Sequence, residues 1–283
     1  MIKVGPAGSD LNFKLKYKNS YEMPKYLNEL GLSAFEYQCS RGVKVNDEIA
    51  SKLKDEALKY NISLSVHSPY YISLSTQEEE KKINTIKYIT DTMIAAKKMG
   101  ATRVVVHAGS LLNLDRDYAV KSACILLKRA IDEADKLGLG DITICPETMG
   151  KINQLGTSSE IIQMCKVDDR IIPTIDFGHL YCRSLGKLNT EDLFEQELLL
   201  YINELGYERM KHFHAHFSRM EYTLNGGEKN HVTLDEIEYG PDFDNICKAI
   251  IKLKLEPTII CESAGTQSLD AVKMLNIYNG LNI

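Results

Sequence analysis

The sequence lacks the features that mark secreted and membrane proteins. Its seven cysteines are an odd number and form no Cys-x-x-Cys pair, so a disulfide scaffold is excluded and free, buried thiols are expected. No run approaches the roughly 18 apolar residues that a membrane span requires. The opening MIKVGPAGSD has no basic stretch followed by an apolar one. We therefore expect a cytoplasmic protein without a secretory signal or a membrane partner.

A strong excess of one charge is also missing. The 34 Lys and Arg against 39 Asp and Glu give a formal net charge of −5, which argues against a domain that holds nucleic acid by bulk positive charge. The hydrophobic share of 44% and the charged share of 26% exclude general disorder and a collagen-like fibre. No linker, low-complexity segment or repeat divides the chain. We expect residues 1–283 to form a single, monomeric domain.

Short β-rich runs alternate with longer helical patterns. Strands that alternate with helices of roughly 10–20 residues are typical of parallel β/α units. Eight such units make a (β/α)8 TIM barrel, an α/β fold, the leading prediction for a chain of this length, with a doubly wound open sheet as the alternative. The expected strands are 2–4, 34–37, 62–66, 103–106, 142–145, 171–175, 211–213 and 258–261.

Capping and stop signals predict the helices between these strands. Thr76 with Glu79, and Thr157 with Glu160, have the spacing of a capping box. Gly100 stops the helical pattern that the first box opens. The other expected helices are a run from Asn46 to Tyr60 and the segments 117–137, 191–204, 243–253 and 268–275.

Histidines and acids gather where the expected strands end, which is where barrel enzymes carry their chemistry. Six of the seven histidines lie at strand ends, the seventh lies in the loop after the seventh strand, and none is expected on a helix. The candidate metal ligands are His67, His107, Glu147, Asp176, His179, His214, His231 and Glu262. Any one of them alone could be a structural residue.

Together these residues predict a metal centre. Neutral imidazoles beside carboxylates are the ligands that borderline divalent cations prefer, and the cations would compensate the converging negative charge. One catalytic zinc ion takes about three protein ligands, so eight candidates indicate two or three ions, bridged by a carboxylate at separations of about 3.5–4 Å. Such a cluster suits the hydrolysis of a phosphodiester.

The strand-end motifs VHSPYYISL, VVHAGS, PETMG, IDFGH, HFHAHFS and CES, in this order, resemble those of the endonuclease IV family of abasic-site DNA nucleases. The resemblance covers essentially the whole chain, and its specific part lies in His67, His107 and His231. The other ligands are shared with the wider xylose-isomerase-like superfamily. The resemblance implies a TIM barrel that hydrolyses duplex DNA 5′ to an abasic site in base-excision repair, leaves a 3′-hydroxyl, and uses a metal-bridging hydroxide as the nucleophile.

The same resemblance implies a ligand set for three Zn²⁺ ions, with Mn²⁺ as a possible replacement. His67, His107 and Glu147 would hold the first ion. Glu147 would bridge to the second. The second ion would also bind Asp176, His214 and Glu262, and the third would bind His179 and His231. Glu147 and Glu262 are the carboxylates expected to act in catalysis.

Two departures from the family pattern affect this set. The family has an Asp two residues before the position of His231, where this chain has Lys229, and Glu228 could take its place if the loop shifts. The family pattern His-x-Asn-Asp after the seventh strand is also replaced, because His214 is followed by Ala215, His216 and Phe217. Three roles stay open for His216: an extra metal ligand, a hydrogen-bond donor to phosphate, or a residue that fills the core.

The family inserts side chains from two loops into duplex DNA at the lesion. Tyr70 and Tyr71, directly after His67, and Arg41 after the second strand stand where such residues would be. The alternative is that the tyrosines cover the barrel mouth above a small substrate. The cations expected at the rim for phosphate contacts are Arg41, Lys44, Arg183, Lys187, Arg219 and Lys229.

A sugar isomerase or epimerase on the same barrel is the competing function. One Mn²⁺, Co²⁺ or Mg²⁺ would then lie on Glu147, Asp176, His214 and Glu262, while a carboxylate moves the proton. His67, His107 and His231 would bind substrate hydroxyls. A non-catalytic binding domain is a third possibility, although such a ligand set has no obvious structural role.

Overall fold

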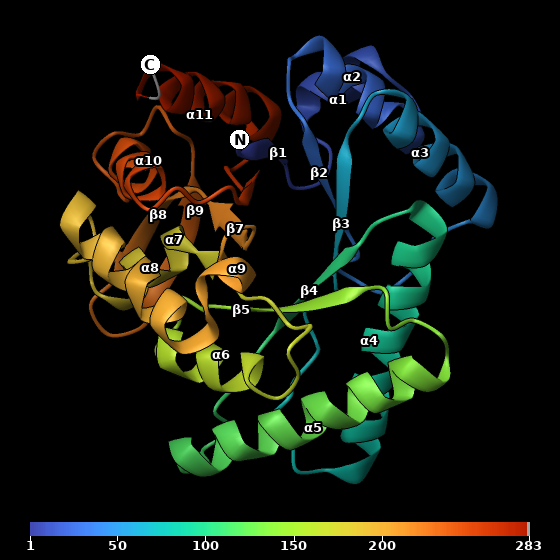
Figure 1. The fold of residues 1–283 in the computed structure, drawn as a ribbon, viewed down its shortest axis with the longest axis vertical. Coiled ribbons are helices and arrows are strands. Elements are labelled where there is room, and N and C mark those ends of the chain that lie inside the picture. Colours follow the sequence, from blue (N-terminus) through green and yellow to red (C-terminus); the bar gives the residue numbers. More distant parts are fainter. Residues whose placement is uncertain (282–283) are drawn as a thin grey trace.

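The computed structural model describes residues 1–281 as a (β/α)8 barrel, which confirms the predicted fold. Eight parallel strands follow one another in the order β1-β10-β7-β6-β5-β4-β3-β2, and helices surround them (Figure 1). The barrel strands are β1 (Lys3–Pro6), β2 (Ala34–Gln38), β3 (Ser63–His67), β4 (Arg103–His107), β5 (Thr143–Glu147), β6 (Thr174–Asp176), β7 (His214–Phe217) and β10 (Thr258–Cys261).

The ring closes between β1 and β2, where the backbones come very close. The amide of Ser33 donates to the carbonyl of Val4 at 3.0 Å, and the amide of Gly8 donates to the carbonyl of Glu36 at 2.8 Å. A Cβ atom on Gly5 would lie 1.6 Å from the backbone oxygen of Ala34. Only glycine fits at this point, because the obstacle is backbone that cannot rotate away.

Several helices begin at residues whose side chains cap them, and most helices lie where the sequence predicts them. Asn46 caps α3, and Thr157 with Glu160 forms the expected capping box at α6. The expected box at Thr76 does not form, because α4 begins after Glu78. The helices are α1 (Leu11–Lys16), α2 (Met23–Glu29), α3 (Asp47–Lys59), α4 (Glu79–Met99), α5 (Arg116–Lys136), α6 (Ser158–Cys165), α7 (Phe177–Arg183), α8 (Glu191–Leu205), α9 (Tyr207–Met210), α10 (Phe243–Lys252) and α11 (Gln267–Leu281), with a 3-10 turn at Ser20–Glu22.

Three expectations about the second half of the chain were wrong. The seventh strand is β7 at His214–Phe217 rather than 211–213, because residues 211–213 lie in the approach to the strand. The segment expected as a loop around His231 is an antiparallel hairpin of β8 (Arg219–Thr223) and β9 (Gly227–Val232). His179, expected outside any helix, lies in the first turn of α7.

The strands divide their side chains between two environments. Ala215 and Phe217 of β7 belong to the hydrophobic core outside the barrel wall, as do Val104 and Val106 of β4. Because successive side chains of a strand point to opposite faces, the histidines of β7 point toward the barrel axis. Within residues 1–281, no helix is both long and apolar enough to cross a membrane.

Candidate metal centre

The first group of converging ligands comes from three adjacent strands. His67 ends β3, His107 ends β4 and Glu147 ends β5. The Nε2 atoms of His67 and His107 lie 3.3 and 3.1 Å from Oε2 of Glu147. Glu147 is 1% exposed, so this carboxylate has almost no contact with solvent.

The second group shares Glu147 with the first. It adds Asp176 from the end of β6, His216 from β7 and Glu262 directly after β10. Nδ1 of His216 lies 3.1 Å from Oε1 of Glu147 and 3.6 Å from Oε2 of Glu262. One ligand atom from each of the four residues lies within 4.8 Å of the others, which is close enough for a shared cation.

The third group joins α7 to the hairpin. Nε2 of His179 lies 3.5 Å from Oε2 of Glu228, and His231 lies beside them with its ring centroid 5.8 Å from that of His179. Glu228 therefore occupies the place that the sequence left uncertain, while Lys229 turns away to pair with Glu221 at 2.6 Å. The absence of a side chain at Gly150 makes this possible, since a Cβ atom there would lie 2.7 Å from Cβ of Glu228.

The structure places His216, and not His214, among these ligand atoms. The register of the sheet is the reason. His216 lies opposite Asp176 on β6, whereas His214 lies opposite Thr174, two residues deeper in the barrel. Nε2 of His214 donates to Oε2 of Glu36 at 2.8 Å, and the imidazole lies in none of the candidate ion-binding groups found in residues 1–281. The geometry therefore replaces His214 with His216 as the candidate ligand from β7.

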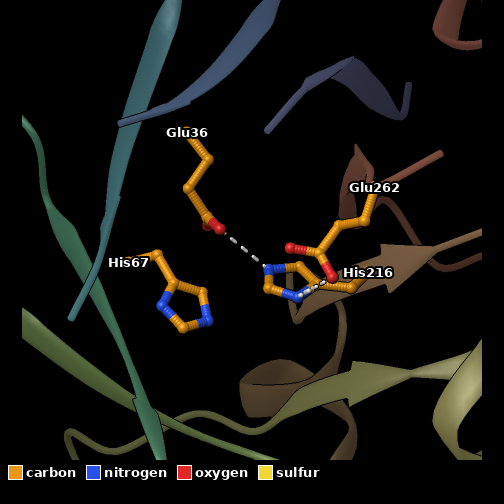
Figure 2. A group of neighbouring side chains, drawn as sticks. All are labelled: Glu36, His67, His216 and Glu262. Carbon is orange, nitrogen blue, oxygen red and sulfur yellow. Dashed lines mark ion pairs between the residues drawn. The ribbon is translucent and has the colours of Figure 1, made fainter. Parts of the chain in front are cut away.

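Sequence reasoning missed Glu36, a fully buried carboxylate of β2. It forms a further group with His67, His216 and Glu262, in which the four side chains face one another across the barrel (Figure 2). The only signal in the sequence was an acid between two aromatic residues in the run AFEYQ, which reads equally well as the polar position of an alternating strand.

The arrangement of hydrogen bonds fits a bound cation. His67 donates from Nδ1 to the carbonyl of Ser68 at 2.8 Å, and His179 donates from Nδ1 to the carbonyl of Thr148 at 2.9 Å. Each backbone bond would leave the lone pair of Nε2 available to a cation bound between the ring and the neighbouring carboxylate. Metal-binding histidines use their second nitrogen in this way, because the backbone bond fixes the tautomer and the orientation of the ring.

The electrostatics of the centre show that its acids need compensation. Burial by itself would raise the pKa of Glu147, but the charges of His216 and His107 and the hydrogen bonds of His107 and His179 hold it well below its usual range. Burial would likewise lower the pKa of His67, yet its hydrogen bond and charge interaction with Glu147 raise it to about 9. His214 differs, because burial lowers its pKa to about 4 and outweighs the effect of Glu36. In the protein alone, protonated imidazoles thus supply the positive charge that cations would otherwise bring.

The groups open into a cavity of about 490 Å³ at the carboxyl end of the barrel. Tyr70 stands at its mouth, 58% exposed, with its ring centroid 5.9 Å from that of His107. Tyr71 is also half exposed but packs edge-on against Tyr88 at 4.9 Å, in a neighbouring cavity of about 650 Å³. Arg41 lies exposed in the loop after β2.

Three of the cations expected at the rim have other partners. Arg183 donates to the backbone carbonyls of Met149, Lys151 and Gln154. Arg219 pairs with Asp242 at 2.8 Å, and Lys229 pairs with Glu221. These side chains hold the loops around the cavity together, while Lys151, which was not expected, lines the cavity itself.

With this geometry established, comparison with known proteins shows the family. The model of the xylose isomerase-like TIM barrel family matches residues 24–277. The chain belongs to the xylose isomerase-like TIM barrel family. Membership accounts for the barrel and for the position of the centre at the carboxyl ends of its strands, but it does not specify a reaction.

Two relatives with similar sequences show how far the likeness extends. An uncharacterized protein of Methanocaldococcus jannaschii is 32% identical over 281 residues, which are 99% of this chain and 98% of that protein. A probable endonuclease 4 of Acholeplasma laidlawii is 25% identical over 196 residues, which are 68% of this chain and 65% of that protein, so the match spans about two thirds of either. Relatives of the latter kind confirm the resemblance to the endonuclease IV family.

Solved structures of other proteins share the fold. A D-tagatose 3-epimerase-like protein superposes with a TM-score of 0.71 at 18% identity, covering 99% of this chain and 98% of the other. Endonuclease IV from Thermus thermophilus superposes with a TM-score of 0.70 at 16% identity, covering 98% of each chain. At these identities the likeness shows the barrel and leaves the activity open.

Proposed function

We propose that this protein is a metal-dependent endonuclease that hydrolyses the DNA phosphodiester 5′ to an abasic site and leaves a 3′-hydroxyl. The observation that carries the proposal is the presence of three ligand groups, two of which share Glu147, around one cavity. A mononuclear enzyme needs only one such group, whereas hydrolysis of a phosphodiester gains from several cations that bind the phosphate and the leaving oxygen.

The carboxylates of the metal centre would have separate roles in this reaction. Glu147, buried between the first two groups, would hold two cations at a fixed separation. Bound divalent ions would supply positive charge for the phosphate and lower the pKa of a water molecule. Glu262, whose side chain is 17% exposed and lines the cavity, is placed to accept a proton from that water molecule. The protein would use Zn²⁺, with Mn²⁺ as a possible replacement.

Recognition of duplex DNA would involve the side chains above the centre. Tyr70 is exposed beside His67 and His107, so its ring can enter the gap left by a nucleotide that has swung out of the stack. Tyr71 and Arg41 would support the DNA on the same side of the mouth. The cavity beside the centre, lined by both tyrosines and Lys81, offers space for the continuing strand.

One observation favours the second candidate, a sugar epimerase. The cavity is lined by several neutral polar side chains that could bind hydroxyl groups: Gln38, Ser40, Gln154 and Gln267. Glu147, Asp176, His216 and Glu262 would then hold a single ion, and one carboxylate would move a proton at the carbon next to a carbonyl. The third ligand group would have no function in that reaction.

A nicking assay tests the first candidate. The purified chain, loaded with Zn²⁺, should cut a duplex oligonucleotide that carries one tetrahydrofuran abasic analogue, directly 5′ to the lesion, and a DNA polymerase should extend the product. The same duplex without the lesion should stay intact, and EDTA should abolish the cut. If folded protein with at least two ions per chain leaves the lesion duplex intact, the proposal fails. Conversion of D-tagatose by the same preparation would support the epimerase.

A pair of adjacent substitutions separates the two functions at the third ligand group. Glu228→Gln should reduce nicking by more than about tenfold, because it weakens the hold of His179, Glu228 and His231 on their ion. Lys229→Ala should leave nicking unchanged, since Lys229 faces away toward Glu221. Equal activity of the two variants would contradict a role for the third ion.

A further inference from the structure

Glu36 lies beneath the second ligand group, in a position that only a carboxylate fills well. It is fully buried, and its two oxygens accept hydrogen bonds from three side chains and lie close to a fourth. Ser65 Oγ and His214 Nε2 donate to Oε2 at 2.9 and 2.8 Å. Gln38 Nε2 donates to Oε1 at 3.2 Å.

The fourth neighbour is the histidine of the metal centre, whose Nε2 forms an ion-pair contact with Glu36 but no hydrogen bond among residues 1–281. Nε2 of His216 lies 3.1 Å from Oε1 of Glu36, and on the other side of the ring Nδ1 faces Glu147 and Glu262 (Figure 2). The imidazole is therefore held between the buried acid of β2 and the acids of the ion-binding group. With the proton on Nε2, the lone pair of Nδ1 is directed at the place where Glu147, Asp176 and Glu262 converge.

We propose that Glu36 is a positioning residue of the metal centre, which accepts a hydrogen bond from Nε2–H of His216 when a cation is bound and thereby fixes the tautomer and orientation that let Nδ1 bind that cation. The proposal rests on the metal centre that both candidate functions share, and it does not depend on which reaction the protein catalyses. Residues that orient a metal-binding histidine through its second nitrogen typically contribute about 10- to 100-fold to metal affinity.

His214 has a supporting part in this arrangement. Its Nδ1 is buried and has no hydrogen-bond partner among residues 1–281, so its one polar contact is the bond from Nε2 to Glu36. Together with Ser65, it anchors the second oxygen of Glu36 and leaves the first oxygen for His216. His214, the extra histidine of the HFHAHF run, thus supports Glu36 beneath the metal centre.

The test compares Glu36→Gln with Ser65→Ala. Glutamine has the shape of the carboxylate, but its amide would place two hydrogens against donors that already point at it. Glu36→Gln should weaken the binding of one Zn²⁺ by about 10- to 100-fold in a competition titration with a chelator. Ser65→Ala removes one bond to the other oxygen and should change the affinity less than about threefold. Comparable losses in the two variants would overturn the proposal.

Two further measurements keep the outcome decisive. Loss of one whole ion from Glu36→Gln, with unchanged affinity for the others, would make Glu36 itself a ligand and overturn the positioning role. In the wild-type protein with Zn²⁺ and ¹⁵N-labelled histidine, His216 should show a protonated Nε2 and a metal-bound Nδ1, assigned by its disappearance in His216→Gln. The opposite tautomer would refute the proposal even if Glu36→Gln does not fold, and neither readout depends on nicking.

Discussion

Histidines at alternate positions of one strand occupy different depths in a barrel. His214 and His216 lie on the same face of β7 and His212 precedes the strand, yet the surroundings of the three side chains differ. His212 contacts Glu256 at the far end, His214 bonds Glu36 in the interior, and only His216 reaches the acids of the centre. The rise of about 3.3 Å per residue places alternate Cα atoms almost 7 Å apart along the strand. The ring centroids of His214 and His216 lie 5.4 Å apart, and only the ring of His216 lies in the ion-binding groups.

This difference in depth gives a prediction for a pair of identical substitutions. His216→Gln removes Nδ1 but keeps a polar atom near Glu36, so the affinity for one ion should fall more than about hundredfold, beyond the cost of losing an orienting partner. His214→Gln keeps the donor to Glu36 and should retain every ion. Elemental analysis after dialysis against a weak chelator measures both. Loss of an ion from His214→Gln would show that the register argument misassigns the ligand.

At the scale of the elements, the close approach of β1 to β2 closes the barrel. A Cβ atom on Gly5 would overlap the backbone of Ala34. Strand β1 also pairs with β10, which ends directly before Glu262 of the metal centre. The hairpin β8–β9 shows a comparable dependence, because Glu228 reaches the third ligand group only across Gly150. Both glycines allow one element to approach another.

Gly5→Ala should therefore destabilise the protein by about 3 kcal/mol or more, at the upper end of the cost of overpacking, because backbone must move to relieve the contact. Gly280→Ala is the matched control in α11, where a Cβ atom meets nothing within 4 Å among the described residues. That change should be neutral or stabilising by up to about 1 kcal/mol, because alanine favours helix. Chemical denaturation of both variants measures the difference. A Gly5→Ala variant as stable as the control would contradict the close approach of β1 and β2.

At the scale of the whole molecule, ion binding and pH are linked. His67 has a pKa raised to about 9 in the folded protein without ions, so at neutral pH it carries a proton that a cation must displace. The affinity for Zn²⁺ should rise as the pH increases toward about 9, with release of protons on binding. Calorimetry in two buffers of different ionisation enthalpy counts those protons. Binding without proton release near pH 7 would show that the imidazoles are already neutral.

The same shift predicts how the stability of the ion-free protein depends on pH. A group whose pKa is raised on folding stabilises the folded state fully below its unfolded pKa of about 6.5 and loses that contribution as the pH passes the folded value. The ion-free protein should thus become less stable between roughly pH 6.5 and 9, while the gain from added Zn²⁺ grows. Thermal unfolding with EDTA and with Zn²⁺ across this range measures both trends.

The sequence by itself determined the barrel and much of its centre. Alternation of short apolar runs with capped helices predicts parallel β/α units, and the carboxyl ends of such strands must converge, so His67, His107 and Glu147 meet as the pattern indicates. Local chemistry was also enough for the capping box at Thr157, because its bonds span only three residues.

Only the tertiary structure decided which side chains share a depth in the barrel. Strand register places His216 rather than His214 opposite Asp176. It also brings Glu36 of β2 within hydrogen-bond distance of His214 of β7, although 178 positions separate the two residues in the sequence. Likewise, Lys229 is an extra residue at an irregular step in the pairing of β8 with β9, and it points outward to Glu221 while Glu228 points inward to His179. The period-two alternation of a strand predicts which face each side chain occupies, but not its depth in the barrel. That depth is set by pairing between distant segments, which no local pattern encodes.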